Sequence, residues 1–91
     1  MPDNEVDLLE ECKKGLGYSS EPNEAVDGNI RQKINTVKMF MKNAGVPNDQ
    51  INSDLGLGII VLGVTDLWDL KSGDVKFSPA FFTLVSQLAL G

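Results

Sequence analysis

The longest regular pattern of apolar and polar positions in the chain extends from about Glu24 to Ala44. Apolar residues recur there three or four positions apart and form one stripe on a helix: Val26, Ile30, Ile34, Val37, Met41 and Ala44. Gly45 suits the left-handed residue that follows a helix, and Pro47 prevents the helix from continuing. The pattern therefore predicts an amphipathic helix that ends at Gly45, and Ser19 or Ser20 can cap its start.

A second stretch, Ser53 to Leu70, is apolar on every side and carries one charge, Asp66, between Leu55 and Leu67. An element that is hydrophobic all round is normally buried in the middle of its fold. A buried pair of strands is the competing interpretation, because the stretch is rich in β-branched residues and contains three glycines. Strands rarely exceed about ten residues, and Ser53 supplies an N-cap. We therefore predict a central helix, closed by a core tryptophan, whose glycines let neighbouring helices approach closely.

The N-terminal segment predicts a short helix from Glu5 to Leu16, where Leu9, Cys12 and Leu16 share one face. Acidic residues lie early in this segment and two lysines lie late, as the helix dipole prefers. Cys12 is interpreted as a small core residue, and a reactive thiol is the alternative.

The C-terminal segment predicts a last helix that begins with Ser78 as N-cap and Pro79 at the first helical position. Its expected buried residues are Phe81, Leu84, Val85 and Leu88, while Phe82 is expected at the surface. Before this helix, Lys71–Asp74 has the composition of a turn, and Val75–Phe77 is expected to be extended. Together the patterns predict one domain, residues 1–91, folded as an all-α bundle of about four helices around a central apolar helix.

Composition limits the chemistry that this domain can support. The chain has 91 residues, one cysteine, no histidine and a net charge of −5, so an intrachain disulfide and a Cys/His zinc site are excluded. We expect no catalytic, cofactor-binding or metal-binding residues, and no enzyme activity. The apolar stretch is too short to span a bilayer, and no signal peptide precedes the acidic N-terminus, so we expect an intracellular, reducing origin.

Two local features invite a functional interpretation without establishing one. Leu55-Gly56-Leu57-Gly58 is glycine-rich but lacks the lysine and the strand–turn–helix context of a phosphate-binding loop. Ser53 at a helix start invites comparison with acyl carriers, which are also small, acidic and helical. Those carriers place aspartate before the serine, whereas here the order is Ser-Asp, so this similarity is weak.

The charges are unevenly distributed along the chain. Residues 1–27 hold eight acidic residues and two lysines, whereas no acid lies between Gly28 and Gly45. In that acid-free segment Arg31, Lys38 and Lys42 fall within roughly 40° of one another on a helix. These three residues, called here the basic stripe, form either a solvated face or a surface for phosphates or an acidic partner.

The order of these features resembles the phage head-tail connector proteins, the head-completion adaptors of long-tailed bacteriophages. The resemblance covers about residues 5–91. It depends most on Asn43-Ala44-Gly45-Val46 at a helix end, on Asp66-Leu67-Trp68-Asp69 at the next one, and on Lys76-Phe77-Ser78-Pro79 followed by Leu84-Val85-Ser86-Gln87-Leu88.

The resemblance implies a virion protein of the neck, made in the host cytoplasm, that forms a homo-oligomeric ring (dodecameric in the virion) under the portal protein. Such a ring extends the DNA channel, surrounds duplex DNA transiently, and binds a stopper or tail protein; no cofactor or membrane is involved. Because the C-terminal part engages the portal in the family, Phe77, Phe82 and Gln87 are the expected portal or subunit contacts. The basic stripe is the candidate for facing DNA or an acidic neighbour. A small helical regulator or nucleic-acid-binding module remains the alternative.

Overall fold

The computed structural model describes residues 4–68, 70 and 76–90, and every regular element among them is a helix. The helices are α1 (Asn4–Leu16), α2 (Glu24–Asn43), α3 (Asn48–Ile51), α4 (Asp54–Trp68) and α5 (Pro79–Ala89). The predicted all-α class is therefore confirmed, with a single helical turn, α3, added between the two longest helices. The predicted turn Lys71–Asp74 and the extended position at Val75 lie outside the described residues.

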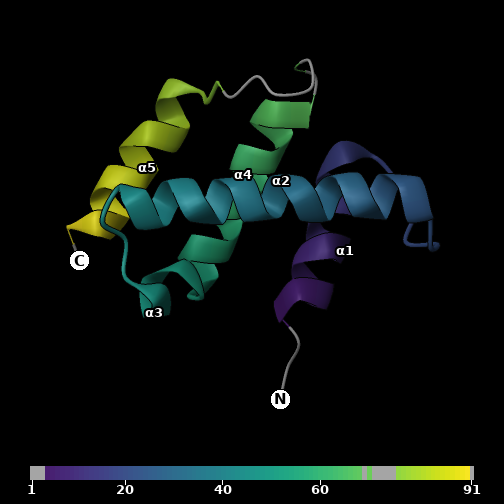
Figure 1. Cartoon of the computed structure of the whole chain (residues 1–91), viewed down its shortest axis with the longest axis horizontal. Helices are drawn as coiled ribbons and strands as arrows, with labels where there is room; N and C mark the ends of the chain where they lie inside the picture. The colour runs from purple at the N-terminus through teal and green to yellow at the C-terminus, as the bar shows by residue number, and fades with distance from the viewer. Residues whose placement is uncertain (1–3, 69, 71–75, 91) are drawn as a thin grey trace.

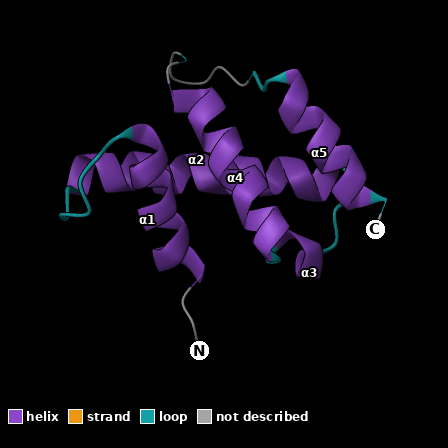
Figure 2. Ribbon diagram, turned by 180° about the vertical axis from the view of Figure 1, so that it is seen from behind, coloured by secondary structure: helices purple, strands orange, loops and turns teal. Residues whose placement is uncertain are grey.

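The helices are arranged in two layers. The molecule measures 37 × 34 × 17 Å along its principal axes, and the shortest dimension accommodates two packed helices. Viewed along that axis, α2 lies in front and crosses α1, α4 and α5, which form the second layer (Figure 1). The reverse view shows the second layer in front of α2 (Figure 2).

The central position predicted for the apolar helix is confirmed, because α4 contacts all four other helices. The strand interpretation of this stretch is wrong. Two of its glycines permit close packing: a Cβ at Gly63 would lie 2.7 Å from the ring of Phe81 and 2.9 Å from both methyl groups of Val37. A Cβ at Gly56 would overlap the carbonyl of Gln50 in α3.

The expectation that α4 is buried all round is wrong on one side. Its core-facing residues are buried, but Leu55 is 55% exposed, and Gly58 is exposed one turn further on. The physical reason is the number of layers: α2 covers one side of α4, α1 and α5 flank it, and none of the described helices covers the remaining side (Figure 2).

The helix ends follow local sequence signals with one exception. Ser53 accepts a hydrogen bond from the Gly56 N–H, and Ser78 accepts one from the Phe81 N–H, as predicted for N-caps. Gly45 has the predicted positive φ, +96°. The exception is α2, which is capped by Asn23 and not by Ser19 or Ser20; the Asn23 side chain accepts from the Val26 N–H at 3.2 Å.

The one charge within the apolar run of α4 has a specific partner. Asp66 Oδ2 accepts hydrogen bonds from both the backbone N–H and the hydroxyl of Ser78, at 3.0 and 2.8 Å. The carboxylate therefore fixes the start of α5 to the last turns of α4. This contact satisfies a partly buried charge and joins two residues that are distant in sequence.

Trp68 packs against the edge of the core and is only partly buried, so the prediction of a core tryptophan is confirmed only in part. Its ring meets Tyr18 edge to face, with centroids 5.7 Å apart, and Lys33 Nζ lies 5.7 Å from its centroid. The tryptophan thus packs the end of α4 against the α1–α2 connection and against α2, and one side of its ring remains open to solvent.

Cys12 is 1% exposed, which agrees with its interpretation as a core residue. Burial, reinforced by the neighbouring Glu11 carboxylate, raises the pKa of its thiol to about 11.

We expect the folded protein to resist labelling by a neutral thiol reagent at pH 7, since the thiolate fraction there is on the order of 10⁻⁴. The same protein should label fully once denatured. Labelling of the folded protein at the rate of a free cysteine would contradict this expectation.

Candidate functional site

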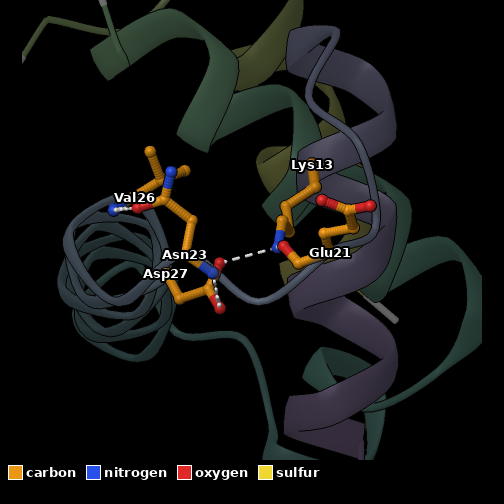
Figure 3. Close-up of polar contacts among 5 residues, drawn as sticks. All are labelled: Lys13, Glu21, Asn23, Val26 and Asp27. Carbon is orange, nitrogen blue, oxygen red and sulfur yellow. Dashed lines mark hydrogen bonds and ion pairs between the residues drawn. The ribbon is translucent and has the colours of Figure 1, made fainter.

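A cluster of polar groups joins the end of α1 to the start of α2 (Figure 3). Lys13, which is only 3% exposed, places its Nζ 2.8 Å from Asp27 Oδ1 and donates a 2.6 Å hydrogen bond to the Glu21 carbonyl oxygen. The other Asp27 oxygen accepts from the backbone N–H of Asn23 at 3.3 Å. One ammonium group therefore holds both the connecting segment and the first turn of α2.

The electrostatics of this cluster stabilise the ionised carboxylate. The close ion pair with the Lys13 ammonium, aided by the Asn23 N–H and the charge of Arg31, holds the pKa of Asp27 below its ordinary value. Because Lys13 pairs with Asp27 and with the Glu21 carbonyl, the cluster ties α1 to the start of α2 and has a structural role. Sequence reasoning placed Lys13 only as a cation near a helix end. The signal it missed was Asn23 followed four residues later by Asp27, a spacing at which the aspartate side chain can accept from the Asn23 N–H.

Replacing Lys13 with methionine should leave the Asp27 carboxylate and the Glu21 carbonyl without their partner. We expect a loss of about 3 kcal/mol in the free energy of unfolding, near the low end for breaking a buried ion pair, since the Asp27 side chain keeps 12% of its exposure. Chemical denaturation monitored by circular dichroism measures this loss in the free energy of unfolding. Lys14→Met is the matched control: Lys14 is 70% exposed, pairs with Glu11 at 3.6 Å, and should change stability by less than about 0.5 kcal/mol.

The pH dependence of the Lys13→Met effect has a definite sign. A carboxylate whose folded pKa is lowered contributes stability above its unfolded pKa and loses that contribution as pH falls through the folded value. The difference between wild type and Lys13→Met should therefore be constant near neutrality and should shrink below about pH 4. A difference that stays the same down to strongly acidic pH would contradict the pairing of Lys13 with Asp27.

The basic stripe occupies one side of α2. Arg31 and Lys42 are exposed and Lys38 is partly buried, so the helix presents the three predicted residues along one edge. The preceding acid, Asp27, is held by Lys13. The geometry is that of a positively charged helix surface available to an acidic partner, or to solvent.

The three predicted contact residues of the C-terminal part do not form one surface. Phe77 is 6% exposed and stacks on Phe81 with centroids 4.1 Å apart, so its ring belongs to the core. Phe82 is 47% exposed, and its ring lies 5.7 to 6.1 Å from those of Phe40, Phe77 and Phe81. Gln87 is exposed but lies about 140° from Phe82 around α5. Of these three residues, Phe82 and Gln87 are therefore open to a partner, and Phe77 is not.

Sequence reasoning did not find a groove between α1 and α4. Its volume is about 240 Å³, and it is lined by Leu8, Glu11, Asp54, Leu57, Gly58 and Val61. The walls are apolar, and the two carboxylate residues at its rim are exposed. The signal for this surface was the apolar outer side of α4, which the sequence alone assigned to the core.

Neither a metal-ligand group nor a membrane-spanning helix is found in the described part of the chain. Residues 4–68, 70 and 76–90 contain no group of three or more His, Cys, Asp or Glu side chains placed to hold a metal ion. None of the described helices has the length and apolar character needed to cross a bilayer. The Ser53 hydroxyl, considered above as a carrier attachment point, donates to the Gln50 carbonyl oxygen at 2.6 Å while it caps α4.

Comparison with protein-family profiles, with curated proteins and with solved structures gave no match to this chain. The class that fold and surfaces define is thus a small all-α domain with candidate interaction surfaces on α2, on α5 and between α1 and α4.

Proposed function

We propose that this protein is a head-tail connector of a long-tailed bacteriophage, a virion structural protein without enzyme activity. On this proposal, copies form a ring under the portal protein, lengthen the DNA channel and present a surface to a stopper or tail protein. The observation that carries the proposal is the resemblance over residues 5–91 described above. The sequence features that carry it lie at helix ends: Gly45 follows α2, Trp68 ends α4, and Ser78 caps α5.

The surfaces of the chain support a binding role. Phe82 is a large apolar side chain that remains 47% exposed on α5, although three other phenylalanine rings surround its inner edge. Aromatic residues that are exposed on a rigid element are common anchors of protein interfaces. Phe82 is therefore the proposed portal anchor, and Gln87 is a further polar contact on the same helix.

Purified protein added to DNA-filled, tailless heads tests the proposal. After the heads are pelleted, bound protein is quantified, and the portal vertex is imaged by electron microscopy. We expect a ring of density beneath the portal and retention of the genome. Phe82→Ala should bind heads less well, whereas Thr83→Ala, at the exposed neighbouring position, should bind as wild type does. Heads that pellet without the protein would refute the proposal.

A regulator or nucleic-acid-binding module is the second candidate, and the basic stripe is the observation that favours it. Three cations on one edge of α2 would give salt-sensitive binding to duplex DNA through the phosphates. A gel shift at low and high salt distinguishes the two candidates. The connector proposal expects no stable complex of free monomer with duplex DNA, whereas the module requires one that is lost in Arg31→Ala and Lys42→Ala variants.

A further inference from the structure

The groove between α1 and α4 is an uncovered apolar surface with an acidic rim. The two helices are close where a Cβ at Gly15 would lie 3.5 Å from Val61, and the groove lies beside this contact, towards the N-terminus of α4. Leu57 and Val61 contribute apolar walls, and the exposed Glu11 and Asp54 flank them. Among the described residues Glu11 pairs with the exposed Lys14 at 3.6 Å, a weak surface contact that a new cationic partner can replace.

The opposite layer of the molecule carries the complementary surface. α2 forms the other layer, in front of α1, α4 and α5 in Figure 1 and behind them in Figure 2. Met39 on that helix is 64% exposed. Lys42 follows Met39 by three residues, so the two side chains are neighbours on the helix surface. Met39, Lys38 and Lys42 thus form an apolar knob beside positive charges, in a segment without any acidic residue.

We propose that the α1–α4 groove binds the α2 surface of a second copy of this chain. Met39 of one copy enters the groove of the next, and Lys38 and Lys42 approach Glu11 and Asp54 at its rim. Because the two surfaces are different and lie on opposite layers, the contact is heterologous and each copy can bind two neighbours. The step from this pairwise contact to a closed ring rests on the proposed function.

Two features favour a protein side chain over a small molecule as the occupant. The volume of about 240 Å³ is below the roughly 300–1,000 Å³ of most small-molecule sites. A methionine side chain is unbranched and adapts to irregular apolar gaps. The acidic rim selects a basic surface, and among the described surfaces of this chain the acid-free part of α2 has that charge.

Filling the groove without disturbing the fold is the first test. A Cβ at Gly58 would meet no atom within 4 Å, and glutamine favours a helix more than glycine does. Gly58→Gln should therefore melt at or above the wild-type temperature, yet should lose self-association measured by light scattering at low ionic strength and high protein concentration. Thr83→Gln, at an exposed position of α5, is the matched control and should associate as wild type does.

Three outcomes of this test would overturn the proposal. They are a wild-type protein that stays monomeric over the whole concentration range, a Gly58→Gln variant that associates as wild type does, and a Thr83→Gln variant that loses association equally. Wild-type association should also weaken as salt is added, because the charged pairs at the rim are screened.

A charge exchange is the second test. Lys38→Glu/Lys42→Glu and Glu11→Lys/Asp54→Lys should each be folded by circular dichroism and monomeric, because each now opposes like charges in the contact. Mixing the two variants should restore association, since the reversed α2 of one fits the reversed groove of the other. A mixture of folded variants that stays monomeric would overturn the proposed pairing.

The head-binding assay separates this inference from the proposed function. If Gly58→Gln forms the same ring on heads as wild type, the connector function stands and the groove is not the subunit contact. If wild type associates through the groove but does not bind heads, the self-association stands and the connector function fails.

Discussion

Gly56→Ala is expected to destabilise the protein by about 3 kcal/mol, although it adds a single methyl group. The new Cβ would overlap the Gln50 carbonyl and lie 2.5 Å from the Ile51 carbonyl oxygen. Both atoms are backbone, so no rotamer change can relieve the overlap, and the turn from α3 into α4 has to move. Urea unfolding monitored by circular dichroism measures the loss.

Gly58→Ala is the matched control, because it makes the same change two residues later in the same helix. Nothing lies within 4 Å of a Cβ at Gly58, and alanine favours a helix over glycine by up to about 1 kcal/mol. We therefore expect Gly58→Ala to stabilise the protein slightly. Equal effects at the two positions would contradict the close approach of α3 to α4.

Phe81→Ala is expected to cost about 3–5 kcal/mol, the usual range for removing a buried phenylalanine. Phe81 is fully buried, stacks on Phe77 and touches the position of Gly63 in α4. A domain of 91 residues has a total stability of about 5–14 kcal/mol. The variant should thus lose a large part of its stability, measurable as a lower denaturant midpoint.

Phe82→Ala is the control for Phe81→Ala, since the two phenylalanines are adjacent on α5. Phe82 is 47% exposed, so its removal should lower stability by no more than about 1.5 kcal/mol. The two variants together separate a core residue from a surface residue that is proposed to bind a partner. A Phe82→Ala variant as unstable as Phe81→Ala would place Phe82 in the core and weaken its proposed role.

Local signals were sufficient to predict most of the helices. The apolar stripe of α2, the Ser78-Pro79 start of α5 and the glycine after α2 each act over a few residues. The ranking of caps was less reliable: Asn23 stands where Ser19 or Ser20 was expected. Several polar residues near a helix start can each supply a cap, and Asn23 is the one that directly precedes Glu24, the first residue of α2.

The candidate surfaces were only partly predictable. The basic stripe follows from the helical period and is at the surface as expected, with Lys38 partly buried. Phe77 was expected as a contact residue but is buried, because α5 folds back on α4 and stacks Phe81 against it. The apolar outer side of α4 is visible in the sequence, but the α1–α4 groove also needs α1, which is distant in sequence, so the local pattern does not locate the groove.

The sequence by itself determined the helical class, the ends of most helices and the apolar character of α4, because periodicity and capping are local properties of the chain. Only the tertiary structure decided which sides of those helices are covered. The pairing of Lys13 with Asp27, the contact of Asp66 with Ser78, and the uncovered side of α4 depend on how separate helices are placed. That placement comes from the packing of the whole core, which allows two layers and leaves one apolar side of α4 open.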